Sequence, residues 1–264
     1  SNLSKLYNYF YEYFTKYMKD YLNYDGLAVM AHRGGSLEAP ENTIESFKYA
    51  LEIGSDIIET DIQLSSDGVP YIFHDDDLKR VSDIETNFND LLSTEIDELK
   101  IFDDYKIPKL EETLKQFPNA RFQIDFKTDE VVDPAIEIIN KFPHIKKNLC
   151  VASFSSQRLH KIKSKLNEVT YSMGPREVLK LLLKSFGLYR GEVDGDCLQI
   201  PIYRYGIKIV TKRFVEFCKH ENIKISVWTI NSIEEMNYLI DLEVDGIITD
   251  KPKALINLLA SKNI

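Results

Sequence analysis

The chain has 264 residues, 44% of them hydrophobic, and a formal net charge of −9 at pH 7. A chain of this length can bury about 75% of its unfolded surface around one core, and α/β barrels of this size are single domains. The acidic charge argues against nucleic acid as a partner and against a generally basic, membrane-seeking surface. An anionic substrate would therefore need local positive charge at its binding site.

The cysteine pattern and the hydropathy suit a cytoplasmic protein. Cys150, Cys197 and Cys218 are widely spaced and form neither a CxxC motif nor a zinc pattern, so we expect reduced core residues. No run approaches the roughly 20 apolar residues that cross a bilayer, and no signal peptide is recognisable. The chain begins with Ser1-Asn2 rather than methionine, which leaves open whether a leader has been removed.

Residues 1–26 are expected to form an amphipathic N-terminal helix that precedes a domain of residues 27–264. Tyrosine and phenylalanine recur in this segment at helical spacing, with lysines and a glutamate between them. Two interpretations fit: a helix packed on one end of the domain, or an interfacial membrane helix, which aromatic residues and lysines also suit. Packing is favoured because the polar residues carry mixed charge, so membrane contact is the less favoured alternative.

Strands and helices alternate through the rest of the chain. The expected strands cover residues 27–31, 57–62, 71–75, 121–127, 149–154, 169–173, 197–201, 225–230 and 246–250. The expected helices cover residues 44–53, 110–117, 136–142, 157–165, 178–186, 212–220, 233–242 and 252–259. This rhythm predicts an α/β fold with a parallel sheet, closed or doubly wound. The length and the polar residues at strand ends favour a TIM (β/α)8 barrel.

The region around residues 76–108 breaks this alternation. It is polar, holds one weak helix over residues 94–99, and is expected to form a small insertion over the site after the strand of His74. The hairpin before it leaves no room for a helix between its strands. We therefore expect the barrel to be irregular at this point.

The stretch 56–75 carries the strongest local signal. Two β-rich runs flank an Asp-Gly pair, which is typical of a tight hairpin turn. A turn centred on that pair places Asp61 opposite His74, and Glu59 projects from the same side as Asp61. Buried carboxylates must be paired or must hold a cation. Glu59 and Asp61 are hard oxygen ligands that suit Mg²⁺ or Ca²⁺, and His74 can transfer protons near neutral pH.

The alternative for this stretch is an exposed Glu-x-Asp pair on a solvated strand, with His74 as a structural histidine. The apolar neighbours in both runs disfavour that alternative.

Trp228, the only tryptophan, lies at the end of a late strand, where core packing and a substrate-stacking wall are equally compatible with the sequence.

Two further strand ends carry candidate phosphate ligands. The segment His32-Arg33-Gly34-Gly35 follows the first strand, where glycines allow close backbone approach and the arginine can bind phosphate oxygens bidentately. Asp125 and Lys127 share one face of the strand over residues 121–127. Asp125 could complete a three-carboxylate site and Lys127 could supply a point charge for phosphate. Taken alone, the two residues are explained equally well by a surface ion pair.

These motifs, in this order, resemble the glycerophosphodiester phosphodiesterase family. They are His32-Arg33-Gly34, Pro40-Glu41-Asn42-Thr43, Glu59-x-Asp61, Asp67-Gly68, His74-Asp75, Ile107-Pro108-x-Leu110-x-Glu112, Asp125-x-Lys127, Ser153-Phe154, Val227-Trp228-Thr229-Ile230-Asn231 and Asp245-Gly246-Ile247-Ile248-Thr249-Asp250-x-Pro252. The resemblance spans residues 28–259 and implies a TIM-barrel hydrolase of lipid and glycerol metabolism. Such enzymes release sn-glycerol 3-phosphate and an alcohol such as choline or ethanolamine, and they use one divalent cation, Mg²⁺ or Ca²⁺.

The resemblance also implies roles for individual residues. The metal ligands would be Glu59, Asp61 and Asp125; the general acid and base would be His32 and His74; the substrate contacts would be Arg33, Lys127, Phe154 and Trp228. In the mechanism proposed for the family, the glycerol 2-hydroxyl attacks phosphorus, the alcohol leaves protonated, and water then opens a cyclic phosphate. The family usually has glutamate where this chain has Asp125. Because Mg²⁺ demands tight octahedral geometry, the shorter side chain is expected to shift preference toward Ca²⁺ or to leave a water in the gap.

Three other functions were weighed against this one. A lysophospholipase D acting on lysophospholipids could use the same residues, with the apolar segment 178–183 receiving an acyl chain, although a core helix explains that segment equally well. A phosphoinositide-specific phospholipase C is disfavoured because no basic cluster suits an inositol polyphosphate. A catalytically inactive binding or scaffold barrel is disfavoured because the expected catalytic and metal-binding residues are all present. The preferred head group and the oligomeric state stay open.

Overall fold

The computed structural model describes residues 19–102 and 104–264, and the fold of these residues is a TIM barrel. The helix expected over residues 1–26 therefore falls mostly outside the described residues. Along the ring, the parallel strands are β1 (Ala28–His32), β2 (Ile57–Leu64), β4 (Phe122–Phe126), β5 (Leu149–Ala152), β6 (Thr170–Tyr171), β7 (Cys197–Ile200), β10 (Lys224–Val227) and β11 (Gly246–Thr249). The last strand, β11, pairs with β1. The predicted barrel is thus confirmed.

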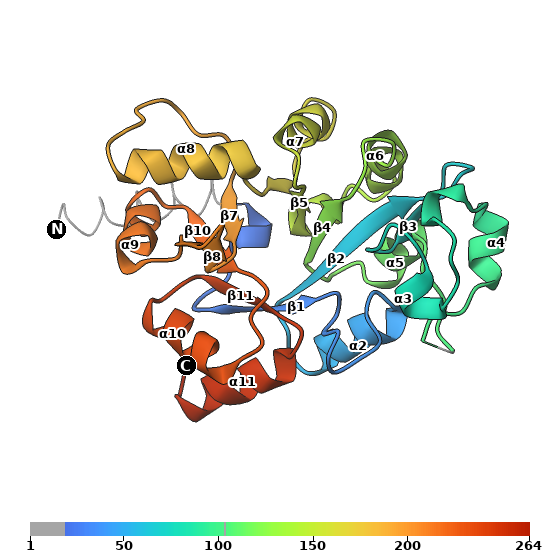
Figure 1. Ribbon diagram of the computed structural model, residues 1–264, viewed down its shortest axis with the longest axis horizontal. Helices are drawn as coiled ribbons and strands as arrows, with labels where there is room; N and C mark the ends of the chain where they lie inside the picture. The colour runs from blue at the N-terminus through green and yellow to red at the C-terminus, as the bar shows by residue number, and fades with distance from the viewer. Residues whose placement is uncertain (1–18, 103) are drawn as a thin grey trace.

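Helices surround the ring on all sides (Figure 1). They are α2 (Ile44–Glu52), α5 (Leu110–Gln116), α6 (Val132–Asn140), α7 (Ser156–Lys163), α8 (Pro175–Ser185), α9 (Lys212–His220), α10 (Ile233–Asp241) and α11 (Pro252–Ser261). Helix α2 begins where the sequence indicates, because the side chain of Thr43 accepts a hydrogen bond from the backbone N–H of Ser46. Each predicted helix outside residues 1–26 has a counterpart, with ends that shift by a few residues.

The ring closes weakly between β6 and β7. Ser172 and Cys197 form an isolated parallel bridge there, whereas β2 and β4 are paired over five residues, from Ile58 with Phe122 to Ile62 with Phe126. As predicted, the alternation of strands and helices is irregular at the hairpin, because an antiparallel strand follows β2 where a helix would otherwise come. The second run of the hairpin, β3 (Pro70–Ile72), pairs only with β2 and lies outside the ring, so it does not disturb the pairing of β2 with β4.

The hairpin register also differs from the prediction by one residue. Strand β3 aligns Ile72 with Ile62, and the N–H of Phe73 donates to the carbonyl of Asp61 at 3.0 Å, so Asp61 does not face His74. The connection spans residues 65–69 and is centred on Asp67 rather than between Asp67 and the following glycine. The carboxylate of Asp67 accepts hydrogen bonds from Ser65 and Ser93, and these bonds hold the longer turn in place.

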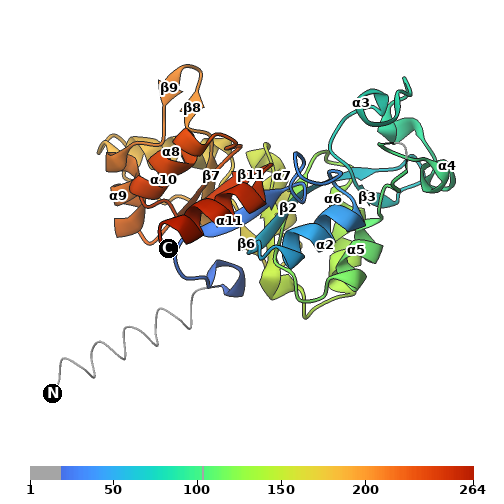
Figure 2. The same ribbon diagram turned by 90° about the horizontal axis from the view of Figure 1, so that it is seen from below.

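Residues 76–108 form short elements with a core of their own. These are α3 (Lys79–Ser82), η2 (Phe88–Asp90) and α4 (Ser93–Glu98). The buried side chains of this core include Tyr71, Phe73, Leu78, Val81, Phe88, Ile96, Ile101 and Ile107. Figure 2 shows α3 standing out from the barrel on the side where the strands end.

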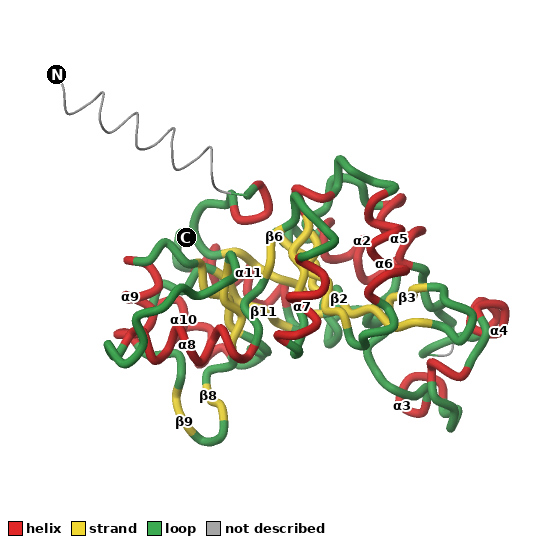
Figure 3. Tube along the Cα trace, turned by 90° about the horizontal axis from the view of Figure 1, so that it is seen from above, coloured by secondary structure: helices red, strands yellow, loops and turns green. Residues whose placement is uncertain are grey.

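A second hairpin was not predicted. It consists of β8 (Tyr203–Arg204) and β9 (Ile207–Lys208), and it projects from the same side of the barrel as α3 (Figures 2 and 3). At the opposite end, η1 (Asp20–Leu22) packs Tyr21 and Leu22 against the interior of the barrel.

All three cysteines are buried with free thiols, as the sequence predicts. Two of them, Cys150 and Cys197, lie inside the ring beside Met30 and Ile57. In the part of the chain that the structure describes, every helix is too short or too polar to cross a bilayer.

Phe47 of α2 is the centre of one half of the core. Its ring is fully buried and packs edge-on against Phe122 at 5.6 Å and Phe117 at 6.1 Å between centroids. Truncating it should leave a cavity that the surrounding strands cannot fill. We expect Phe47→Ala to lower the free energy of unfolding by about 3–5 kcal/mol.

Urea unfolding followed by far-UV circular dichroism would measure this loss. Leu51→Ala on the same helix is the control, because Leu51 is 37% exposed and its truncation should change stability by about 1 kcal/mol or less. Equal losses in the two variants would contradict the role given to Phe47.

Candidate active site

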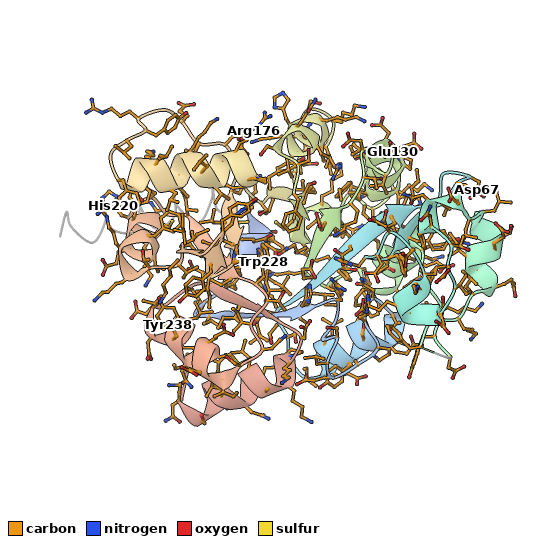
Figure 4. The ribbon with its side chains drawn as sticks, viewed as in Figure 1. Asp67, Glu130, Arg176, His220, Trp228 and Tyr238 are labelled. Atoms are coloured by element: carbon orange, nitrogen blue, oxygen red, sulfur yellow. The ribbon has the colours of Figure 1, made fainter. Side chains whose placement is uncertain are left out.

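One cavity of about 200 Å³ lies at the carboxyl ends of the barrel strands. It is lined by all nine side chains that the sequence singled out, namely His32, Arg33, Glu59, Asp61, His74, Asp125, Lys127, Phe154 and Trp228. Trp228 lies near the middle of the ring in Figure 4. The cavity has the position at which TIM barrels hold ligands, because loops and strand ends converge there.

The parallel register brings the acidic residues together. His32 of β1 aligns with Glu59 of β2, and Asp61 of β2 aligns with Asp125 of β4. Aligned residues on neighbouring strands project from the same face, so these side chains all point into the barrel. The three carboxylates are only 6%, 3% and 6% exposed for Glu59, Asp61 and Asp125.

Two cations lie against this cluster. Lys127 Nζ is 3.4 Å from Asp61 Oδ1 and 3.3 Å from Asp125 Oδ2. Arg33 Nε lies 3.6 Å from Asp61 Oδ2, which also accepts a hydrogen bond from the Asn42 amide at 3.2 Å. Burial opposes the charge of Lys127, but Asp61 and Asp125 outweigh it and raise the pKa of the ammonium group.

The positive charge in the cluster does not balance the negative charge. Burial, and then repulsion from Asp61, raise the pKa of Glu59 to about 7. Burial raises the pKa of Asp125 to about 6, although Lys127 opposes that shift. In addition, Asp125 Oδ1 is buried without a hydrogen-bond partner. A cluster with these properties favours a further cation.

The donor set fits a divalent cation by its chemistry, although its side chains do not yet converge on one point. Among residues 19–102 and 104–264, no three acidic, histidine or cysteine side chains already converge at metal-binding distances, and Lys127 lies between Asp61 and Asp125 instead. The chemistry of the donors nevertheless fits, because carboxylate oxygens are the ligands that Mg²⁺ and Ca²⁺ prefer. The clearest sign of a cation site is Asp125 Oδ1, a buried carboxylate oxygen without a hydrogen-bond partner.

His32 is held by a carboxylate at the end of β11. Its Nδ1 donates to Asp250 Oδ1 at 2.5 Å, while its Nε2 lies 3.8 Å from Glu59. Burial would raise the pKa of Asp250, but hydrogen bonds from His32, Ser36 and Asn231 lower it to about 2. Burial of the His32 ring disfavours its charged form, yet Glu59 and Asp250 outweigh this effect and raise its pKa. Asp250 was visible in the sequence only as part of a motif.

His74 is held in the same manner, from the other side of the cavity. Its Nδ1 donates to Asp75 Oδ1 at 2.7 Å, and Arg80 Nε donates to Asp75 Oδ2 at 2.7 Å. The side-chain amide of Gln63 donates to the backbone carbonyls of His74 and Asp75 at 3.4 and 3.1 Å. These bonds aim His74 into the cavity, although it does not pair with Asp61 as predicted.

Arg80 joins the two sides of the site, and it was not predicted. Besides Asp75, it binds both oxygens of Glu41, at 2.6 and 3.0 Å. Glu41 in turn accepts a hydrogen bond from Arg33 Nη1 at 3.0 Å, and the backbone N–H of Arg33 donates to Glu59 at 3.2 Å. Arg80 is therefore a positioning residue, which orders both histidine-bearing loops through their carboxylates.

The loop after β1 needs glycine. Gly34 has a φ of +82°, and a Cβ there would lie 2.3 Å from the Ser46 hydroxyl oxygen. Since Ser46 belongs to the first turn of α2 and takes part in its cap, the loop and the helix fit together only without a side chain at Gly34.

The mouth of the cavity is aromatic. Phe154 is 61% exposed and packs edge-on against Trp228, with 5.7 Å between the ring centroids. Lys127 Nζ lies 6.0 Å from the centroid of Phe154. Arg204 of β8 also lines the cavity and was missed, because its segment carries no motif.

Known proteins are similar to this chain in sequence and in fold. The model of the glycerophosphoryl diester phosphodiesterase family matches residues 32–254. A glycerophosphodiester phosphodiesterase of Caldanaerobacter subterraneus is 31% identical, over 88% of this chain and 97% of that protein. A human protein named lysophospholipase D is 24% identical, over 87% of this chain and 85% of that protein. The crystal structure of a glycerophosphodiester phosphodiesterase from Thermotoga maritima has a TM-score of 0.71 at 28% identity, covering 89% of this chain and 100% of that one.

The cluster makes the stability of the metal-free protein depend on pH. Folding raises the pKa of Glu59 to about 7 and of Asp125 to about 6, so the folded state binds more protons than the unfolded state between about pH 4 and pH 7; the raised pKa of His32 extends this window upward. The free energy of unfolding should therefore fall as the pH rises through this window. The lowered pKa of Asp250 makes the free energy of unfolding rise with pH, but only below about pH 4.

Thermal unfolding in EDTA should show a Tm that drops by roughly 5 °C from about pH 5 to about pH 8. In Glu59→Gln the drop should be clearly smaller, since one of the titrating groups is removed. A wild-type Tm that stays constant or rises across the window would argue against the raised pKa values.

Proposed function

Because this chain belongs to the glycerophosphoryl diester phosphodiesterase family, we propose that its cavity hydrolyses glycerophosphodiesters to sn-glycerol 3-phosphate and an alcohol. The observation that carries the proposal is the meeting of three buried carboxylates and two carboxylate-anchored histidines in one cavity. Its volume of about 200 Å³ is below the roughly 300–1,000 Å³ of pockets that hold drug-sized ligands, which suits a small polar diester.

We propose that Glu59, Asp61 and Asp125 hold one divalent cation, Mg²⁺ or Ca²⁺. When bound, such a cation would neutralise charge on the phosphate oxygens and polarise the phosphorus centre. The cation would then partly neutralise Asp61 and Asp125, the carboxylates that Lys127 and Arg33 contact in this structure. Both side chains line the cavity and could then contact phosphate, Arg33 through its guanidinium and Lys127 as a point charge.

His32 and His74 supply the proton transfers in this proposal. Each uses Nδ1 to bind a carboxylate, which fixes the ring and leaves Nε2 available to the substrate. One histidine removes the proton of the glycerol 2-hydroxyl as that oxygen attacks phosphorus, and the other protonates the departing alcohol. The roles reverse when water opens the cyclic phosphate.

A lysophospholipid is the second candidate substrate. Met173, Pro175 and Val178 line the cavity, so an acyl chain could lie along an apolar wall. One human relative is named lysophospholipase D. The same carboxylates and histidines would act, and only the contacts outside the reacting phosphodiester would differ.

An assay with glycerophosphocholine and lysophosphatidylcholine in parallel, with and without EDTA, tests both candidates. We expect turnover of glycerophosphocholine that EDTA abolishes and that Mg²⁺ or Ca²⁺ restores. His32→Gln and His74→Gln should each lower kcat by about 10²–10⁴-fold, because each removes a proton-transfer group.

His220→Gln is the matched control, since the side chain of His220 is 85% exposed on α9. Turnover of lysophosphatidylcholine alone would replace the first candidate with the second. Absence of metal-dependent turnover of either compound would refute both.

The length of residue 125 should set the choice of metal. Aspartate is one methylene shorter than glutamate, and Ca²⁺ tolerates longer and looser ligand shells than Mg²⁺. We expect Asp125→Glu to shift the ratio of the two dissociation constants toward Mg²⁺ by about tenfold, as measured by calorimetric titration.

Asp129→Glu provides the control, because Asp129 is an exposed partner of Arg158 and should leave the ratio unchanged. If wild type and Asp125→Glu showed the same preference, the length of this side chain would not decide the metal.

A further inference from the structure

The β8–β9 hairpin is firmly anchored at its base. Ile202, Ile209 and Val210 are buried in the core beneath it. The backbone N–H groups of Ile209 and Val210 both donate to the carbonyl of Ile202, at 2.8 and 3.4 Å. The hairpin therefore projects from the barrel as a fixed element (Figure 3).

Its turn is short and well defined. Tyr205 and Gly206 are the two turn residues, with φ values of 51° and 77°. Two successive residues with positive φ are typical of the type I′ turn, whose twist matches that of the paired strands. Because the turn already fixes the backbone of the tip, binding through its side chains should cost little conformational entropy.

The tip exposes apolar surface that no other part of the described chain covers. Tyr203, Tyr205 and Ile207 are 57%, 90% and 67% exposed. Single exposed apolar residues are normal, but three on one six-residue hairpin, at its turn and on both of its faces, make its tip apolar, as is typical of an interaction surface.

The register connects this patch with the cavity. Arg204 aligns with Ile207, so both side chains lie on one face of the hairpin, and Arg204 lines the cavity. Tyr203 aligns with Lys208 on the other face, where Lys208 Nζ lies 4.1 Å from the ring centroid of Tyr238 on α10. A surface that meets the tip therefore also meets the mouth of the cavity.

We propose that the tip of this hairpin inserts into the headgroup region of a zwitterionic lipid surface and thereby turns the cavity mouth toward the lipid. Tyrosine suits this depth because its ring is apolar and its hydroxyl is polar. Arg204 adds a positive charge beside the tip, since its guanidinium carbon lies 5.4 Å from the ring centroid of Tyr205, where a lipid phosphate can meet it. Of the two kinds of lipid surface, the net charge of −9 disfavours an anionic one and favours a zwitterionic, phosphocholine-type one.

This proposal does not depend on the proposed chemistry, because vesicle binding is measured without turnover. We expect the full chain to float with phosphatidylcholine vesicles. Tyr205→Ser/Ile207→Ser should lower the partition coefficient at least tenfold, since two inserted side chains are removed. Neither residue lines the cavity, and an unchanged Tm would show that the variant is folded.

Leu51→Ser/Ile264→Ser is the matched control. These residues are 37% and 63% exposed, at the end of α2 and at the end of the chain, away from the hairpin (Figure 2). The control should bind vesicles as the wild type does. If the hairpin variant also bound them as tightly as the wild type, another segment, such as residues 1–26, would carry the binding and the proposal would fail.

A fluorescence experiment locates the tip directly. Because Trp228 is the only tryptophan, Tyr205→Trp in a Trp228→Phe background places a single reporter at the turn. Its emission should shift to the blue on addition of phosphatidylcholine vesicles. No shift would overturn the proposal, and so would a shift that appears without vesicles as the protein concentration rises, because the tip would then bind a second copy of the chain.

Discussion

Buried negative charge at the carboxyl ends of β2 and β4 determines how the site is built. The parallel register places Asp61 beside Asp125, and Glu59 lies two residues before Asp61 on the same face. Burial makes each of these charges unfavourable unless a positive group lies close by. Lys127 supplies part of that charge but leaves Asp125 Oδ1 without a partner. The cavity thus holds buried negative charge that its own cations do not fully satisfy, which is what the proposed cation site requires.

A second set of carboxylates orients the two histidines. Asp250 and Asp75 are each surrounded by donors, so their charge is satisfied and they can fix a histidine ring. Arg80 connects one of these carboxylates to Glu41 and so couples the insertion to the barrel. The carboxylates with a full set of hydrogen-bond donors, Asp75 and Asp250, orient the histidines. The carboxylates without a full set, such as Asp125, are those that would bind a cation in the proposed function.

Local patterns in the sequence predict most of this arrangement, because strand alternation alone puts Glu59 and Asp61 on one face. The hairpin register was missed because it depends on a five-residue turn that Ser93 of α4 stabilises, and that contact is tertiary. Arg80 and Arg204 were missed for a related reason. Each lies in a segment without periodicity, and only the folded insertion and the β8–β9 hairpin carry them to the cavity.

The seam between β6 and β7 has a consequence for how the barrel can deform. Only an isolated bridge joins Ser172 to Cys197, and β6 itself is two residues long. Strain in the ring should be released first where the fewest hydrogen bonds must break. That weak joint lies across the ring from the pairing of β1, β2 and β4. Local opening of the barrel should therefore begin at this seam, away from the strands that carry Glu59, Asp61 and Asp125.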